Sequence, residues 1–414
     1  MRILFRVLAS VSAGLLAPTA PASDETHPTL QIYFVDVEGG QSTLIVTPER
    51  HSLLIDTGWA GDGSGFRPGD PHHARDANRI VAAARDAGIT QIDYLLVTHF
   101  HVDHDGGVTE LAQLMPIRTF IDHSAPSDEA DRASPGTKDA YAAYLRVRSG
   151  GAHLEPRAGE RLPLKDIEAI VVSSAAATLE APLAAGGAAN AACPEQATPA
   201  RDQYENPRST GVVVRYGKFR FLDVGDLTGQ PLFNLVCPKN LIGPVDAYLV
   251  AHHGGPDAAV AETFAALKPR VAIMNNGVSK GGARVTYEAL HHVPDLEDVW
   301  QLHASTEAAD ANFPARDIAN LDEGSAHWIK LVASADGSFR VLNQRTGKML
   351  LTVGGLYGFG TQAAGQFLTD PKYLTKFAAS LKSGWESKNL QLVIRTEVID
   401  GTPGPPELIA SWVW

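Results

Sequence analysis

The sequence predicts an α/β fold in which two sheets stack face to face and helices cover their outer surfaces. Short strand patterns alternate with helical patterns from residue 30 to about residue 350, which is typical of such layered folds. Residues that can bind metal ions recur directly after predicted strands, where layered folds carry their functional loops. A hydrophobic content of 44% and a charged content of 20% are typical of a globular protein.

The first half of this pattern begins with apolar runs that end at turn residues. Asp56-Thr57-Gly58 ends the third run, and Gly88 ends the first helical pattern. Strands are predicted at 31–37, 42–46, 52–55, 94–97, 117–121 and 167–172, and helices at 78–87, 108–115 and 138–147.

The second half of the pattern follows an Ala-, Gly- and Pro-rich stretch, 174–204, which we interpret as a surface loop. Beyond residue 356 the composition changes, and this part is predicted to contain a helix and two strands. Strands are predicted at 211–216, 219–224, 247–251, 271–274 and 299–303, followed by hairpins across 328–350.

The N-terminal segment, residues 1–22, has the features of a secretory signal peptide. Arg2 and Arg6 precede an apolar stretch, 7–17, that is too short to span a bilayer, and small residues surround a cleavage site near Ala22. An uncleaved anchor is the alternative. We therefore expect a periplasmic or secreted protein with no membrane span in its mature form.

Charge and cysteine content limit the partners. The formal net charge is −12, and removal of the signal, with two arginines and no acid, would make it −14. An acidic protein is not expected to bind nucleic acid non-specifically, because it gains little from counterion release. In an oxidising compartment Cys193 and Cys237 can form a disulfide, although the sequence leaves their pairing open.

Three histidines and two aspartates crowd into seven positions after the strand predicted at 94–97. His99, His101 and Asp103 alternate, so their side chains point to the same side of an extended segment. His104 breaks this alternation, and the chain must bend near Asp103 for all four groups to converge. Gly106 and Gly107 are predicted to supply the freedom for this bend. Imidazole and carboxylate together suit zinc or a similar divalent ion.

Further candidate ligands follow later strands. Asp226 comes after the strand predicted at 219–224, and His252 follows the one at 247–251. Six ligands divide naturally between two ions, with one carboxylate bridging them. His123, at the end of the strand predicted at 117–121, is a further candidate ligand.

Several motifs in this order resemble the metallo-β-lactamase superfamily. Thr98–Gly107 matches its HxHxDH signature, Leu54–Gly58 its upstream strand motif, and Gly225-Asp226 its bridging aspartate. His252–Gly255 and Ile32–Gln41 are similar to motifs of its competence-protein (ComEC-like) branch. The resemblance covers about residues 30–350. It implies an αββα sandwich with a dinuclear metal site between the sheets, and a small C-terminal α+β extension.

The resemblance assigns the first metal to His99 and His101, with Asp226 as the bridge. No histidine precedes Asp226 at the family's usual third-ligand position, where this chain has the segment 205–209. His123 could therefore complete the first metal site, or the site could lack a third histidine.

The resemblance assigns the second metal to Asp103, His104 and His252. Asp56 would orient the motif from behind the ligands, an arrangement that metal sites usually need. Gln41 stands where the branch has aspartate. Two divalent ions are expected, zinc first, with manganese as an alternative.

The implied function is that of a secreted hydrolase that uses a metal-bound hydroxide on phosphodiester or related ester bonds. Asp103 and Asp226 are the expected catalytic residues. A lactone or β-lactam hydrolase is one alternative, and a non-catalytic, metal-stabilised binding module is another. We expect a small-molecule or short ester substrate. Residues 28–355 would form the hydrolase domain, and 356–414 an extension of unknown role.

Four polar residues are predicted to lie in loops at the rim of the site, where they could contact an anionic substrate group. They are Arg208, Asn275, Asn276 and Lys280.

Overall fold

The structure, a computed structural model, describes residues 28–347, 349–351, 366–367, 370–378, 390–396, 398–399 and 402–413. The predicted signal peptide, residues 1–22, and the predicted domain boundary near residue 355 lie outside these residues. The chain divides into a compact unit at Pro28–Leu350 and a second unit that begins at Leu351. The two units are described separately below.

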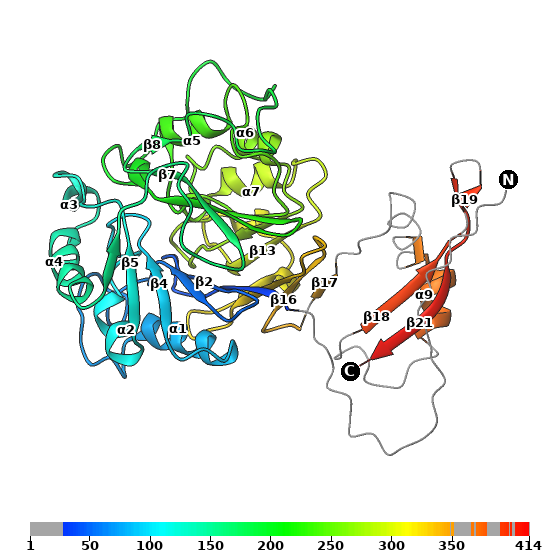
Figure 1. Cartoon of the computed structure of the whole chain (residues 1–414), viewed down its shortest axis with the longest axis horizontal. Coiled ribbons are helices and arrows are strands. Elements are labelled where there is room, and N and C mark those ends of the chain that lie inside the picture. The colour runs from blue at the N-terminus through cyan, green and yellow to red at the C-terminus, as the bar shows by residue number, and fades with distance from the viewer. Residues whose placement is uncertain are drawn as a thin grey trace. The chain divides into compact units, whose positions relative to one another are not determined.

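The first unit contains two large sheets (Figure 1). The first sheet has nine strands among the described residues, in the order β17 (Met349–Leu351), β16 (Phe339–Asn343), β15 (Ile329–Ala333), β1 (Leu30–Phe34), β2 (Thr43–Val46), β3 (Ser52–Ile55), β4 (Ile92–Leu96), β5 (Ile117–Ile121) and β6 (Ala152–Leu154). The pairs β16–β15, β15–β1, β1–β2 and β2–β3 are antiparallel, whereas β3, β4, β5 and β6 run parallel.

The second sheet has eight strands in the described part of the chain. Their order is β14 (Ile318–Asn320), β13 (Asp298–His303), β12 (Val271–Met274), β11 (Ala247–Leu249), β10 (Phe219–Asp223), β9 (Gly211–Tyr216), β7 (Glu168–Ser174) and β8 (Ala177–Thr178). The strands from β10 to β14 are parallel to one another. Their carboxyl ends therefore meet at one edge of the sheet.

Helices cover the outer face of each sheet (Figure 1). They are α1 (Arg75–Asp86), α2 (Val108–Leu114), α3 (Ala130–Ala133), α4 (Thr137–Arg148), α5 (Gly229–Val236), α6 (Val260–Leu267) and α7 (Arg284–Leu290), with short 3-10 turns η1 (Asn206–Arg208), η2 (His252–Gly254), η3 (Ala309–Ala311) and η4 (Ala315–Asp317).

Alternating side chains of the strands separate the core into layers. In β1, Ile32 and Phe34 face the layer between the two sheets, whereas Tyr33 faces the layer beneath α1, α2 and α4. A third layer packs the outer face of the second sheet against α5, α6 and α7. The predicted α/β class, with two stacked sheets and outer helices, is confirmed.

Gly106 and Gly107 have a different role from the one expected. They were expected to give the chain freedom to bend after Asp103. Instead, a Cβ atom at Gly106 would lie 2.2 Å from the carbonyl oxygen of Val102, and one at Gly107 would lie 2.4 Å from that of Thr57. These glycines allow the motif to pack closely against the backbone after β3.

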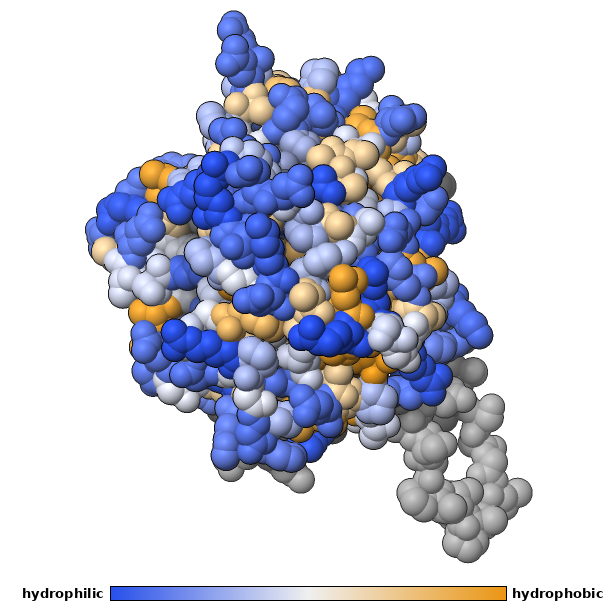
Figure 2. Space-filling view, turned by 90° about the vertical axis from the view of Figure 1, so that its left-hand side faces the viewer, coloured by the Kyte–Doolittle hydropathy of each residue, from blue (hydrophilic) through white to orange (hydrophobic). Residues whose placement is uncertain are grey.

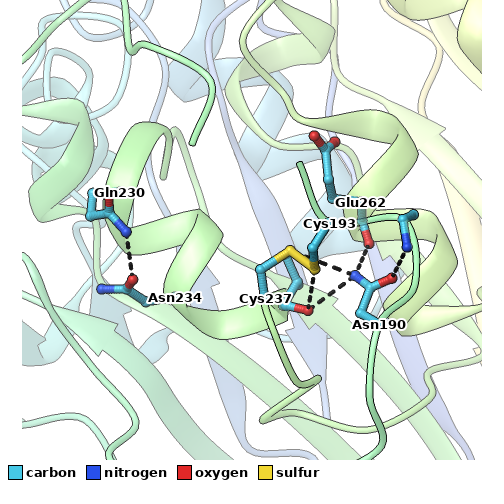
Figure 3. The surroundings of a disulfide bond; sticks show 8 residues. Asn190, Cys193, Gln230, Asn234, Cys237 and Glu262 are labelled. Carbon is cyan, nitrogen blue, oxygen red and sulfur yellow. Dashed lines mark hydrogen bonds between the residues drawn. A yellow bond between two sulfur atoms is a disulfide. The ribbon is translucent and has the colours of Figure 1, made fainter. Parts of the chain in front are cut away.

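The loop from residue 174 to 204 is mostly irregular, as predicted, and is fixed to the second sheet's helical layer by a disulfide. Cys193 and Cys237 are bonded, with a sequence separation of 44 (Figure 3). Asn190 donates hydrogen bonds to the carbonyl oxygens of Val236 at 3.0 Å and Glu262 at 2.9 Å. The disulfide and this amide hold the loop whose far end reaches the functional site.

The surface drawn in Figure 2 is mostly hydrophilic, with hydrophobic residues in small, scattered groups. The large apolar side chains that are exposed on the first unit are separated in sequence, as with Tyr204, Val285 and Leu321. Scattered residues of this kind are ordinary for a globular protein. None of the helices in the described ranges is long and apolar enough to cross a membrane.

The second unit contains a helix and strands in the parts that the structure describes. They are α9 (Pro371–Ala378), β18 (Leu390–Arg395), β19 (Val398–Ile399), β20 (Thr402–Pro403) and β21 (Glu407–Val413). Strands β18 and β21 pair in an antiparallel ladder, and β19 pairs with β20. The helix and strands predicted for this part of the sequence are therefore present.

Candidate metal centre

The candidate centre lies where strands of both sheets end. The HxHxDH segment follows β4 of the first sheet, and Asp226 follows β10 of the second. The amide of Thr210 donates to the carbonyl oxygen of Thr98 at 2.8 Å, and the amide of Gln41 donates to that of Asp103 at 3.1 Å. The first of these bonds joins the two sheets, and the second joins two loops of the first sheet, at the edge where the predicted ligands gather.

Four buried side chains converge there: Asp103, His104, Asp226 and His253. Each offers one ligand atom, and the four atoms all lie within 4.8 Å of one another. The Oδ2 atom of Asp226 is 3.2 Å from Nε2 of His253 and 3.3 Å from Nε2 of His104. The Nε2 atoms of the two histidines face each other at 3.3 Å. This arrangement of nitrogen and oxygen donors could hold a metal ion.

His99 and His101 form a second pair of ring nitrogens beside this cluster. Nε2 of His99 lies 3.0 Å from Nδ1 of His101 and 3.9 Å from Oδ2 of Asp226. The other ring nitrogen of His101, Nε2, contacts Oδ2 of Asp202 at 2.9 Å. Asp226 of the cluster is therefore also near His99, as a carboxylate shared by two donor groups would be.

The structure places His253 where the sequence prediction placed His252. Nε2 of His252 is 3.8 Å from Oδ2 of Asp226 and 3.1 Å from the side-chain nitrogen of Asn206. His252 is thus beside Asp226 but outside the four-residue cluster. Both histidines have left-handed backbone angles, with φ of 52° and 50°. This tight turn after β11 directs the second ring, rather than the first, toward Asp103 and His104.

His123 is not brought into the cluster. Its Nε2 atom contacts Oε1 of Glu205 at 3.1 Å, and its ring lies 5.0 Å from that of Phe100. His123 also borders a cavity of ≈ 670 Å³, together with Ser124, Arg157 and other residues. None of the four clustered residues lines this cavity.

Carboxylates on the far side of the histidines fix their orientation. Nδ1 of His104 is 2.7 Å from Oδ2 of Asp56, as the sequence resemblance implied for that aspartate. Nδ1 of His252 is likewise 2.7 Å from Oδ1 of Asp257. A carboxylate on one ring nitrogen fixes the tautomer and leaves the other nitrogen free to bind an ion.

Sequence reasoning missed Asp202, Glu205 and Asp257. Asp202 lies near the end of the loop at 174–204, and Glu205 lies in the segment 205–209, where no third histidine was found. Glu205 accepts hydrogen bonds from the amides of Phe100 at 3.1 Å and Ser127 at 2.8 Å. The available signal was this pair of acidic residues at the end of the Ala-, Gly- and Pro-rich loop.

The charges in the cluster favour a cation. Burial alone raises the pKa of Asp226, but His253, His104 and His252 lower it, so the pKa lies well below its usual range. Burial lowers the pKa of His104, yet Asp226, Asp103 and Asp56 together raise it well above its usual range. A cluster that attracts a proton this strongly also attracts a divalent ion.

The predicted rim residues divide into two groups. Asn275 and Asn276 are buried, which corrects their placement in a rim loop: their amides bond to Gln41 and to the backbone of His303. The side chains of Arg208 and Lys280 are partly exposed, at 29% and 39%.

Two buried acceptor atoms near the cluster also fit a metal centre. Among the described residues, Oδ1 of Asp226 and Oδ1 of Asn206 are buried without a hydrogen-bond partner. A buried acceptor of this kind is costly unless something binds it.

Imidazole and carboxylate donors suit zinc, iron and manganese alike, so the donor set leaves the identity of the ion open.

The HxHxDH segment lies within a match to a known protein family. Residues 35–136 match the family model of the metallo-beta-lactamase superfamily. The match spans about a quarter of the chain and contains His99, His101, Asp103 and His104. It supports a superfamily relationship for the matched segment and does not distinguish the ComEC-like branch. No curated protein sequence matched significantly.

The solved structures that match this chain are distant from it in sequence. The diiron beta-hydroxylase CmlA from Streptomyces venezuelae is 16% identical, with a TM-score of 0.33, and the alignment covers 60% of this chain and 44% of CmlA. A metallo-beta-lactamase with a HARLDQ motif from Cronobacter sakazakii is 16% identical, with a TM-score of 0.28 and coverage of 48% and 61%.

The metallo hydrolase Igni18 from Ignicoccus hospitalis is 11% identical, with a TM-score of 0.36 and coverage of 66% and 94%. This chain thus spans less than two thirds of the length of the CmlA and Cronobacter proteins.

A pair of matched variants distinguishes the roles of the two adjacent histidines. Asparagine tolerates the left-handed backbone at both positions. We expect His253→Asn to lower the affinity for a divalent ion at least 10- to 100-fold, as loss of an orienting partner already does. We expect His252→Asn to retain the ion held by the cluster. Metal content after gel filtration would measure both, and equal loss in the two variants would contradict the assignment of His253.

Proposed function

We propose that this chain is a metal-dependent hydrolase with two divalent ions, and that its substrates contain phosphodiester or related ester bonds. The observation that supports this most is that Oδ2 of Asp226 lies near ring nitrogens of both histidine pairs. It is 3.9 Å from Nε2 of His99, which faces Nδ1 of His101, and it is 3.3 Å and 3.2 Å from Nε2 of His104 and His253. Two donor groups that share one carboxylate are the minimum for a dinuclear site.

Two ions bound there would act as Lewis acids and lower the pKa of a water molecule to near neutrality. The chain's own residues supply position and charge. Asp226 carries a carboxylate whose pKa is kept low by His253 and His104, so it is ionised at neutral pH. Asp56 and Asp202 hold the rings of His104 and His101 in fixed orientations.

An ester or phosphodiester is favoured over a β-lactam because Asp226 lies among the donors. In the family this chain resembles, a bridging aspartate accompanies phosphodiesterase, lactonase and thioesterase members, as the sequence resemblance implies. The proposal includes export, because the N-terminal segment has the features of a signal peptide. The expected substrate is small or short, since the chain is acidic and would not track a nucleic-acid backbone.

Metal content and turnover, measured on one purified sample, test this proposal. The sample would be assayed with zinc, manganese and iron in turn, against a chromogenic phosphodiester, a lactone and a cephalosporin. We expect about two ions per chain and cleavage of the phosphodiester. Cleavage of the lactone or cephalosporin alone would change the substrate class. One ion and no turnover would contradict the hydrolase and favour a metal-stabilised binding module.

A further inference from the structure

Lys280 lies in the loop between β12 and α7, and its ammonium group contacts the candidate centre from a side chain that is 39% exposed. It contacts Oδ2 of Asp103 and donates a hydrogen bond to the carbonyl oxygen of Gly39 at 2.9 Å. It also lies 5.5 Å from the ring centroid of Trp59, on the face of the indole. Three different segments therefore hold this one cation, so it differs from a lysine whose head group is free in solvent.

The oxygen that Lys280 contacts is the ligand atom of Asp103. The same Oδ2 atom is 3.3 Å from Nε2 of His104 and 3.4 Å from Nε2 of His253. A divalent ion bound to these three atoms would be placed very close to the ammonium group. Two cations at such a distance in a buried site repel each other strongly. The ammonium group and an ion therefore compete for one carboxylate.

The backbone of the loop is fixed, so only the side chain of Lys280 has to move. The amide of Gly277 donates to the carbonyl oxygen of Lys280 at 2.8 Å, and the amide of Gly282 donates to that of His253 at 2.8 Å. A Cβ atom at Gly281 would lie 2.4 Å from the backbone oxygen of His253. The flexible four-carbon stem of lysine can turn away from Asp103 while this packing is preserved.

We propose that Lys280 is an internal counter-cation that competes with the metal ion for Asp103. When no ion is bound, the ammonium group neutralises Asp103, and an ion that enters the cluster has to displace it. The competition lowers the apparent affinity of the cluster for the ion but keeps the carboxylate in place until the ion arrives. The inference rests on one part of the proposed function, namely that the cluster binds a metal ion.

Zinc titration of chelator-stripped protein, with a competing chelating dye, tests the competition. We expect Lys280→Met to bind zinc at the cluster about 10-fold tighter or more, because the competing charge is gone. Lys280→Arg keeps the charge and should not bind tighter than wild type. Lys138→Met, at an exposed position on α4, is the matched control and should not change the affinity.

Thermal unfolding gives a second readout that does not depend on turnover. Without zinc, Lys280→Met should melt at a lower temperature than wild type, since Asp103 stays buried without its counter-cation. With saturating zinc the difference should disappear. Unchanged or weaker zinc binding by Lys280→Met, while wild type loads the cluster, would overturn the inference alone. Equal zinc binding by wild type and Asp226→Asn would overturn the metal site, and with it both proposals.

Discussion

Asp226→Asn is expected to lower turnover by more than about 100-fold and to reduce the number of bound ions, while the fold is retained. Replacing a residue that only orients a metal ligand typically lowers metal affinity or activity 10- to 100-fold. Asp226 lies among the candidate ligand atoms themselves, so a larger effect is expected. Its Oδ2 atom is within 4.0 Å of His99, His104, His252 and His253. Asparagine has nearly the same shape but removes the negative charge between these rings. Turnover and metal content of the variant would measure the effect.

Asp223→Asn is the matched control for this experiment. Asp223 is as buried as Asp226 and only three residues away, but its Oδ1 atom accepts hydrogen bonds from Gln41 and the amide of Gly225, both at 3.0 Å. Burial raises the pKa of Asp223 to about 7, so its neutral form is already present near neutrality. We expect the control to keep its metal ions and activity. A similar loss in both variants would mean that any change after β10 disturbs the site.

Arg79→Met is expected to lower the free energy of unfolding by about 3–5 kcal/mol. Nη1 of Arg79 is 2.8 Å from Oδ2 of Asp36 and 3.0 Å from Oε1 of Glu38. Nε2 of His303 approaches the same two carboxylates, at 2.7 Å and 3.3 Å. All four side chains are at most 13% exposed. Removing the arginine leaves two buried carboxylates with one histidine, and an unpaired buried charge is costly.

Arg118→Met provides the comparison for Arg79→Met. The side chain of Arg118 is 65% exposed, and its Nε atom is 3.9 Å from Asp93. Exposed pairs of this kind contribute about 1 kcal/mol or less. Denaturant unfolding of the wild type and both variants, at equal zinc concentration, would give the change in free energy of unfolding that each substitution causes. If the two variants differ from each other by less than about 1 kcal/mol, the buried cluster is not stabilising.

The layered fold was predictable because strands and helices have local periodicities. The apolar runs at 52–55 and 117–121 became β3 and β5 with the same bounds, and Gly88 follows the end of α1 as expected. Predicted boundaries elsewhere moved by a few residues, since the tertiary contacts that end a strand are not local. The strand order was not readable from the sequence, because pairs such as β1 with β15 join segments that are far apart in the chain.

Apart from Asp56, the residues that contact the candidate ligands from outside could not be predicted, for the same reason. The contact of Lys280 with Asp103 spans a sequence separation of 177, and that of Glu205 with the amide of Phe100 spans 105. The sequence placed Lys280 in a rim loop and showed acidic residues near 205, but neither pattern indicated a contact with the metal-binding motif, because most such residues are solvated. Only the packing of the two sheets shows that Lys280 contacts Asp103 and that the buried Glu205 binds the backbone of the motif.

The sequence by itself determined the chemistry of the centre. His99, His101, Asp103 and His104 follow one strand, and their alternation with a break after Asp103 predicted that the chain bends there if the four groups are to converge. The tertiary structure decided which side chains lie nearest to them. It brings His253, rather than His252, into the four-residue cluster, and both histidines lie in a left-handed turn after β11 that depends on the backbone packed around it.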